Sequence, residues 1–538
     1  MTRIKKRAAV VLAMVAAIPL ALSACSTGGT DGGDNAAGEP KFGGELTFAV
    51  NSYPPCLDVA QSARAQNATR QILDNLVDQD KKTSEIIPWL AKSWDVSADG
   101  LKYTFELRDD VKFTNGEKFN AQVAVDNFTT VLELGKMGKA AQASSYLAAY
   151  ENSKAVGEYT LEINLKEPSA GFLQALAENP LSMLSPETLK ATPEDRCAGK
   201  IIASGPFKFS EIVINEKIVM VANEDYNWGS KNMDHEGRPY LDKLTFQTIA
   251  EQSVRIGSTV SGQVQGTDEI QPVDYPTLQA AGVQSVGRPA GGQVLSFLPN
   301  TAPERILSDK AVRQAIQVAI DRATISKTLF DPEYQPPAKS IISSSVPGWA
   351  DVSAGMKHDP EKAKKILDDA GWKLGSDGVR VKDGKRLEIQ IKWSFAGFQS
   401  MMEMAQQNLA EVGIKLELKL LGNAEMTEAQ NARDYDLIYG DLTRPDPDVL
   451  LSNFHGSFSR YLPGGIPELT AMLDEQRTEV DETKRFATVK KIQEYIVNNA
   501  IAFPIVEMAS VMGFGKNVHG VWQEVPRWPN FYDAWIDN

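Results

Sequence analysis

The chain has 538 residues, of which 42% are hydrophobic, the usual share for a globular protein. This length is too great for a single hydrophobic core, so we expect two or three domains. The formal net charge of −14 argues against nucleic acid and anionic lipid surfaces as partners. No two of the four histidines stand three to five residues apart, so no zinc-type ligand pair is visible.

Residues 1–24 have the pattern of a secretory signal peptide. Four basic residues stand near the start, and 8–22 form an uncharged apolar run that is too short to span a bilayer comfortably. The segment ends in Leu22-Ser23-Ala24-Cys25, which resembles a bacterial lipobox. In such signals the cysteine receives a diacylglycerol and becomes the N-terminus. The alternative is an ordinary secreted protein with an incidental cysteine.

Residues 25–42 are mostly glycine, alanine and small polar residues, so we expect a flexible tether. With a lipid on Cys25, this tether would hold the protein outside the cytoplasm, anchored to the cell membrane. Two other cysteines follow, Cys56 and Cys197. An oxidising compartment favours a disulfide between them, and two buried free thiols are the alternative.

The first part of the chain predicts β-hairpins mixed with helices. Strands are expected at 43–50 and at 158–168, and a helix at 121–134. Within 94–113 the pair Asp99-Gly100 separates two β-rich runs, which predicts a hairpin.

The second half predicts alternating helices and strands. We expect one long helix at 308–330 capped by Ser308, and another that begins after Asp359 and ends at Gly371. A strand, a crossover helix and a second strand then imply a parallel pair, at 387–393, 398–413 and 414–420. The remaining expected elements are a strand at 434–441, helices near 466–480 and 482–499, and a strand within 500–506.

No catalytic motif stands out. The sequence has no nucleophile elbow, no phosphate-cradling glycine-lysine loop and no HExxH pattern. Asp441, Asp446 and Asp448 form an acidic cluster, but two prolines interrupt it and the spacing of a calcium loop is missing. We therefore expect no cofactor, no metal site and no enzyme. A secreted, lipid-anchored hydrolase is the alternative from another class, and it would need a nucleophile and a base in its cleft.

Several blocks of sequence resemble one family. They are LAKSWDVSADGLKYTFELRDDVKFTNGEKFNAQVAVDNF (90–128), SGPFKF (204–209), NEDYNW (223–228), SDKAVRQAIQVAIDRATI (308–325) and HDPEKAKKILDDAGW (358–372). In this order they resemble the extracytoplasmic solute-binding proteins of ABC importers, family 5, which has oligopeptide, dipeptide and nickel-binding members. The resemblance extends over roughly residues 45–530.

The resemblance implies an α/β fold, the two-lobed periplasmic-binding-protein fold of the cluster C type, with a hinge and an extra domain inserted in the first lobe. Lobe I would comprise 43–78, 201–295 and 507–538, the insertion 79–200, and lobe II 296–506. Cys56 and Cys197 would then lie near the two ends of the insertion, which makes their pairing sterically plausible.

The resemblance also implies ligand-binding residues in the cleft. Asp441 matches an aspartate that pairs with the α-ammonium of a peptide, and it follows a predicted strand, where ligands of α/β lobes bind. The alternative is an acid that caps its own turn. Tyr146 matches a tyrosine that contacts the peptide backbone, and Tyr53 is a weaker candidate. Trp393 and Phe395 end a strand that faces the cleft, and they either form the floor of a pocket or belong to the core.

By resemblance the protein is a substrate-binding lipoprotein that captures oligopeptides or related amine-bearing solutes and delivers them, as a monomer, to the subunits of a membrane permease. The loop SFAGFQS (394–400) lacks the arginine that dipeptide-specific members place there, so longer peptides fit better. Trp393, Phe395 and Phe398 keep an oligosaccharide as the alternative ligand. Nickel is disfavoured, because His455 lies beyond the loop LTRPDPD (442–448) that follows the predicted strand at the cleft.

Overall fold

The computed structural model describes residues 38–62, 66–457, 459, 461–462 and 464–537. The predicted signal peptide, Cys25 and most of the predicted tether lie outside the described residues. Within the described part of the chain, no helix combines the length and the apolar character that crossing a membrane requires.

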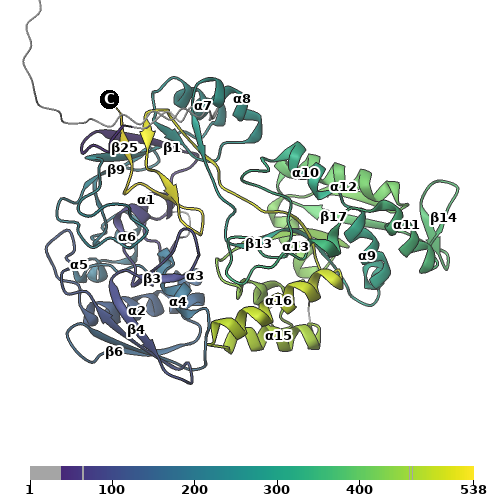
Figure 1. Ribbon diagram of the computed structural model, residues 1–538, viewed down its shortest axis with the longest axis horizontal. Coiled ribbons are helices and arrows are strands. Elements are labelled where there is room, and N and C mark those ends of the chain that lie inside the picture. The colour runs from purple at the N-terminus through teal and green to yellow at the C-terminus, as the bar shows by residue number, and fades with distance from the viewer. Residues whose placement is uncertain (1–37, 63–65, 458, 460, 463, 538) are drawn as a thin grey trace, which may run out of the picture. The chain divides into compact units, whose positions relative to one another are not determined.

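One of the two lobes of the protein, which we call lobe I, is built on a seven-stranded sheet (Figure 1). Its strands come from segments far apart in the sequence, in the order β12 (Gln284–Val286), β21 (Met512–Phe514), β11 (Gly266–Thr267), β1 (Glu45–Val50), β10 (Lys243–Thr248), β9 (Lys217–Ala222) and β8 (Phe207–Val213). Strand β1 is parallel to both of its neighbours, β10 and β11. The alternate residues Leu46, Phe48 and Val50 of β1 point into one core, so the period-two pattern of this segment is realised.

An inserted domain follows β1 in the chain. Its sheet has the order β4 (Ala91–Val96), β5 (Lys102–Leu107), β7 (Thr160–Leu165) and β6 (Tyr150–Ala155), and it packs on α2 (Ala121–Lys136). The predicted hairpin is confirmed, because β4 and β5 pair antiparallel and Gly100 takes the positive φ of 69° that their turn requires. The rest of this region contains β2 (Val77–Gln79), β3 (Ile86–Pro88), α3 (Ala141–Tyr146), α4 (Phe172–Leu176), α5 (Pro186–Lys190) and α6 (Pro193–Cys197).

A disulfide joins Cys56 to Cys197 across 141 positions of sequence. Beside it, the backbone N–H of Leu57 donates to the carbonyl of Cys197 at 3.0 Å. Asp58 and Arg196, both buried, form an ion pair at 3.1 Å. These contacts join the two ends of the chain segment that contains the inserted domain. A covalent link of this kind restricts the unfolded chain and typically stabilises the folded one by about 2–4 kcal/mol.

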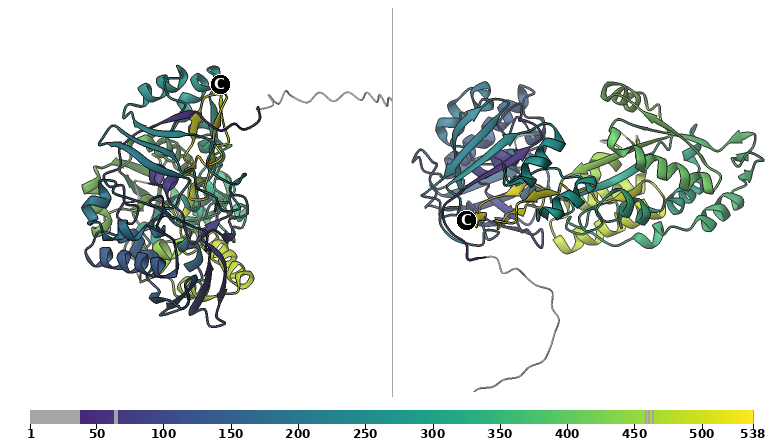
Figure 2. Two further views of the ribbon diagram at one scale, coloured as in Figure 1. Left: turned by 90° about the vertical axis from the view of Figure 1, so that its left-hand side faces the viewer. Right: turned by 90° about the horizontal axis from the view of Figure 1, so that it is seen from above.

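The second half, lobe II, is a five-stranded sheet covered on both faces (Figures 1 and 2). Its strands have the order β18 (Lys415–Leu420), β17 (Glu388–Trp393), β19 (Leu437–Thr443), β13 (Gly292–Pro299) and β20 (Phe503–Val506). One core contains Phe297 and Leu437 with the helices α9 (Lys310–Ala319), α10 (Arg322–Leu329), α11 (Pro360–Asp369) and α12 (Gln399–Glu411). A second core contains Leu298 and Ile438 with α14 (Val449–Phe454), α15 (Pro467–Thr478) and α16 (Glu482–Asn498).

The predicted strand–helix–strand unit is confirmed, because β17 and β18 are parallel and α12 connects them. Gly292, which opens β13, has a φ of 149°, and a Cβ there would lie 2.1 Å from the carbonyl oxygen of Leu442. Only glycine therefore lets β13 approach the end of β19 this closely. Because β13 begins at Gly292, residues 292–295 lie in the sheet of lobe II rather than in lobe I, to which the prediction assigned them.

Two chain segments connect the lobes, and they run beside each other. Ala290 N–H donates to the carbonyl of Met508 at 2.7 Å, and Pro289 and Ala509 form an isolated antiparallel bridge. Figure 1 shows them as a teal and a yellow segment passing between the purple-to-teal lobe I and the green lobe II. A pair of short connections of this kind can act as a hinge.

The prediction of one helix over 308–330 is wrong. The chain forms η5 (Ile306–Ser308), α9 and α10, and Asp309 rather than Ser308 caps α9. The helix stops because Ile320 is extended, and Asp321 begins a new helix by accepting from the backbone N–H of Thr324. Buried Arg322 occupies this break, where its guanidinium donates to the carbonyls of Gln317, Ile320 and Met356.

Candidate functional site

The first cavity of the cleft, cavity 1, has a volume of about 520 Å³ and lies at the ends of two parallel strands of lobe I. Asn51 and Tyr53 follow β1, and Asp268 and Glu269 follow β11. This is the edge of a sheet at which α/β proteins bind ligands. The inserted domain contributes Gln142, Tyr146 and Glu178, the C-terminal segment contributes Pro526, Arg527 and Trp528, and lobe II contributes Thr443 and Pro445.

Cavity 2, of about 630 Å³, lies between the inserted domain and lobe II. Tyr146 lines both cavities, so cavity 2 continues cavity 1. The lobe II side is formed by the end of β19 and the following loop, including Asp441, Arg444 and Asp448. Gln174 and Asp446 then link cavity 2 to cavity 5, of about 570 Å³. The cleft is thus a row of adjoining spaces.

Asp441 lies near the end of strand β19, and its exposed side chain lines cavity 2. It makes no hydrogen bond or ion pair with another residue of the described part of the chain. The surrounding protein raises its pKa by desolvation, and the positive charge of Arg527 partly opposes this rise. Asp441 is therefore a carboxylate that is open to the cleft, has a raised pKa and has no partner among the described residues.

The two tyrosines predicted for the site both line the cleft. Tyr146, at the end of α3, accepts a hydrogen bond on its hydroxyl from Nε2 of Gln142 at 3.2 Å. The guanidinium of Arg444 lies 5.6 Å from its ring centre, which links the inserted domain to lobe II. Tyr53 is half-buried in cavity 1, and desolvation raises its pKa.

Trp393 is a core residue. Its side chain is 1% exposed and packs among the residues between the lobe II sheet and its helices, because β17 is an interior strand with both faces covered. Phe395 is 56% exposed and contacts Phe398, whose ring in turn meets that of Tyr439. Neither Trp393 nor Phe395 lines cavity 1 or cavity 2. We therefore withdraw both as ligand-binding candidates.

Seven charged residues that line cavities 1 and 2 were missed in the sequence: Glu167, Glu178, Asp268, Glu269, Arg444, Arg477 and Arg527. Arg444 follows Asp441 closely in the chain, in the loop after β19, so the sequence could have indicated it as a cleft residue. Its guanidinium lies 3.5 Å from the carboxylate of Asp448. Glu269 and Arg527 have positive φ values of 48° and 95°, which sequence alone does not reveal.

Two of the acids in cavity 1 are held at unusual pKa values. Burial raises the pKa of Glu178 to about 7, against the opposing effect of a hydrogen bond from Gln174. Burial also raises the pKa of Asp268 to about 7, helped by the negative charge of Glu269 and opposed by Arg255. Both groups therefore change charge near neutral pH.

Among the described residues, no group of three or more His, Cys, Asp or Glu side chains is placed to hold a metal ion. His455 is buried in lobe II, where its Nε2 lies 3.2 Å from Asp474. It lines neither cavity 1 nor cavity 2.

The family of the chain follows from comparison with known proteins. Residues 85–460 match the model of bacterial extracellular solute-binding proteins, family 5 middle. The chain belongs to this family. It is 31% identical over 450 residues to the nickel-binding periplasmic protein of Escherichia coli, covering 78% of this chain and 80% of that one. It is 27% identical over 449 residues to the oligopeptide-binding protein AppA of Bacillus subtilis, covering 80% of this chain and 79% of that one.

The crystal structure of NikA from Brucella suis in complex with Fe(III)-EDTA superposes with a TM-score of 0.79 at 24% identity, covering 92% of this chain and all of that one. This likeness confirms the predicted two-lobed α/β fold. As a family 5 protein, the chain is a solute-binding component of an ABC transporter that works outside the cytoplasm, and it is not an enzyme.

Proposed function

We propose that this family 5 protein captures oligopeptides, or related solutes with a free amine, between its lobes and delivers them to a membrane permease. The observation that carries the proposal is Asp441, a carboxylate that lines the cleft, has a raised pKa and has no partner among the described residues. A ligand ammonium would supply the missing charge through a short, charge-assisted hydrogen bond.

The size of the cleft supports a ligand longer than a dipeptide. Pockets for drug-sized ligands usually measure about 300–1,000 Å³. Cavities 1 and 2 alone measure about 520 and 630 Å³, and they adjoin at Tyr146. An extended peptide can lie along this row while its backbone meets the polar groups on both sides. The name of the relative AppA, an oligopeptide-binding protein, agrees with this proposal.

We infer further that the protein acts as a monomer held at the membrane by a lipid on Cys25. The support for the lipid is the sequence pattern that ends in Leu22-Ser23-Ala24-Cys25. The support for a monomer is that both sides of the cleft come from one chain.

The test is calorimetric titration of Asp441→Asn with a mixture of free-amine tetrapeptides. A hydrogen bond to a charged group contributes about 1.5–3 kcal/mol, so the affinity is expected to fall roughly ten- to a hundredfold. The same peptides with an acetylated N-terminus should bind both proteins equally.

The matched control is Asp126→Asn, because Asp126 is exposed on α2 and lines neither cavity. An Asp441→Asn variant that binds free-amine peptides as tightly as this control would remove Asp441 from the site.

A metal held by a small anionic chelator is a second candidate ligand. It is favoured by Arg444 and Arg527, whose guanidinium groups reach the cleft, and by the nickel-binding relative and the Fe(III)-EDTA complex. Titration with the nickel(II)–histidine complex separates the two. Binding of this complex without binding of any peptide would replace the peptide proposal by the chelate. The three aromatic residues that pointed to an oligosaccharide, Trp393, Phe395 and Phe398, do not line cavities 1 or 2.

A further inference from the structure

Arg527 has an unusual backbone conformation at the rim of cavity 1. It stands in the turn between β23 (Trp522–Gln523) and β24 (Pro529–Asn530), with a φ of 95°. A positive φ strains a residue with a bulky side chain, and such residues cluster at ligand clamps. Two backbone hydrogen bonds, Arg527 N–H to Glu524 and Glu524 N–H to Trp528, hold the turn closed at 2.9 Å each.

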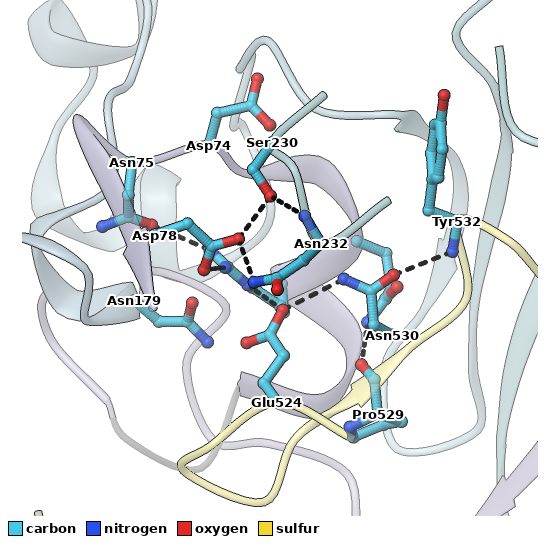
Figure 3. A network of polar contacts seen from close by, with 12 residues as sticks. Asp74, Asn75, Asp78, Asn179, Ser230, Asn232, Glu524, Pro529, Asn530 and Tyr532 are labelled. Atoms are coloured by element: carbon cyan, nitrogen blue, oxygen red, sulfur yellow. Dashed lines mark hydrogen bonds and ion pairs between the residues drawn. The ribbon is translucent and has the colours of Figure 1, made fainter. Parts of the chain in front are cut away.

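A buried polar network fixes the base of this turn in lobe I (Figure 3). The carboxylate of Glu524 accepts from Nε of Arg70 at 2.7 Å and from Nδ2 of Asn530 at 3.1 Å. Arg70 also donates to Asn75 at 2.8 Å and lies 3.9 Å from Asp78. Because Arg70 and Glu524 are both almost fully buried, the position of Glu524 is tightly determined.

The far side of the turn is fixed as well. Nε2 of Gln71 donates to the carbonyl of Pro529 at 2.8 Å, and Oε1 of Gln71 accepts from the N–H of Phe531 at 3.1 Å. Gln71 and Arg70 are neighbours in the chain, so one short segment of lobe I holds both ends of the turn. A strained residue on so firm a base is the arrangement expected of a preorganised binding group.

The side chain of Arg527 is charged and uncommitted. It is the one lysine or arginine among the residues that line cavity 1, whose other charged groups are Glu178, Asp268 and Glu269. The guanidinium lies 5.4 Å from the ring centre of Trp528, and it makes no hydrogen bond or ion pair with any residue that the structure describes. An arginine that lines a cleft and has no hydrogen-bond partner among the described residues keeps its N–H donors available for a ligand.

We propose that Arg527 is a specificity-determining residue that binds a carboxylate group of the ligand, so that the protein selects solutes carrying both an ammonium and a carboxylate. This deepens the proposed function and rests on it. Asp441 lies on lobe II and Arg527 on lobe I, and the positive charge of Arg527 partly opposes the rise in the pKa of Asp441. A ligand with both charges would satisfy the two residues together and so hold the lobes closed.

The planar guanidinium matches a carboxylate through two parallel hydrogen bonds. In a peptide whose ammonium binds Asp441, the carboxylate is either the C-terminus or an acidic side chain near the N-terminus. Arg444 is committed to a different set of contacts, because its guanidinium lies near Asp448 and the ring of Tyr146.

The test is calorimetry with four peptides: trialanine, trialanine amide, and the tripeptide amides that have glutamate or glutamine at the second position. We expect Arg527→Gln to lower the affinity for one of the two carboxylate-bearing peptides, trialanine or the glutamate tripeptide amide, at least tenfold. The affinity for that peptide should then equal the affinity for its neutral counterpart, trialanine amide or the glutamine tripeptide amide. The neutral peptides should bind both proteins alike. Preference for trialanine over its amide identifies the C-terminus, and preference for glutamate over glutamine identifies a side chain.

Arg527→Gly separates binding from folding. Glycine adopts a φ of 95° freely, so this variant is expected to melt no lower than the wild-type protein while losing the same selectivity. The control is Arg386→Gln, because Arg386 is an exposed arginine of β16 (Lys385–Arg386) whose partners are Asp377 and Glu388.

Three results would overturn the inference. If Arg527→Gln changes no affinity, or lowers the affinities of charged and neutral peptides equally, then Arg527 does not bind a ligand carboxylate. The proposed peptide binding would remain valid in either case. If the wild-type protein binds none of the four peptides, the proposed function fails and this inference fails with it.

Discussion

Glu178 connects the cleft to the buried polar network, because it lines cavity 1 and also a small space beside Arg70 and Glu524. Burial raises its pKa from 4.5 to about 7. A carboxyl group with a raised pKa binds its proton more tightly in the folded state than in the unfolded state. Its contribution to stability is therefore complete below pH 4.5 and is lost as the pH rises through about 7.

We expect Glu178→Gln, which stays neutral, to lose less stability than the wild-type protein between pH 5 and pH 8. The difference is on the order of 3 kcal/mol at pH 8. Chemical unfolding at both pH values measures it. Glu403→Gln, an exposed change on α12, should leave the wild-type slope unchanged. Parallel pH slopes for Glu178→Gln and wild type would contradict the assignment.

Among the helices and strands, α16 holds the cleft loop in place. Asp446 in the loop and Arg485 on α16 form a buried bidentate ion pair, with Nη1–Oδ2 at 3.0 Å and Nη2–Oδ1 at 2.5 Å. Nε of Arg485 also donates to the carbonyl of Gln476 at 3.1 Å, which ties α15 to the same point. The loop that carries Arg444 is thus anchored from behind.

Arg485→Met should destabilise the protein by about 3–5 kcal/mol, because it leaves the Asp446 carboxylate buried without its partner. The double variant Asp446→Asn, Arg485→Met should recover part of this loss, since no uncompensated charge remains. Denaturant unfolding of the two single variants and the double variant measures the coupling. Strictly additive free energies of unfolding would show that the pair does not anchor the loop.

The sequence predicts elements well where the signal is local. Asp359 caps its helix as the short-range pattern predicts, and Gly371 and Gly413 end theirs with positive φ. The break between α9 and α10 escapes prediction because it depends on distant partners. Arg322 fills it by donating to the carbonyls of Met356 and Pro504, which no local pattern indicates.

The site was predictable only in part, for a similar reason. Asp441 and Tyr146 were found by their resemblance to family positions, and both line the cleft. For Trp393 the sequence left a pocket floor and the core as alternatives, because a strand covered on both faces shows no difference between a cleft side and a core side, and the structure places it in the core. Arg527 was missed because its turn reaches the cleft through contacts with Arg70 and Gln71, hundreds of positions earlier in the chain.

For the whole molecule, contacts between the inserted domain and lobe II already exist beside the cleft. Nε2 of Gln79 donates to the carbonyl of Pro445 at 3.2 Å, and Ala170 N–H donates to the carbonyl of Arg477 at 2.8 Å. Arg477 also pairs with Glu167 at 2.9 Å. A ligand that binds Asp441 on one lobe and lobe I on the other adds to these contacts. Because such a ligand binds the closed state more tightly than the open state, it increases the population of the closed state. The lobes would close by rotating about the two segments that connect them.

The most direct test of the account is native mass spectrometry of residues 26–538, purified without refolding, with and without added tetrapeptides. We predict a series of adducts at oligopeptide masses on the wild-type protein, and their strong depletion in Asp441→Asn. Adducts spaced by hexose units, or a wild-type protein that stays free of adducts even with added peptides, would contradict peptide capture in this cleft.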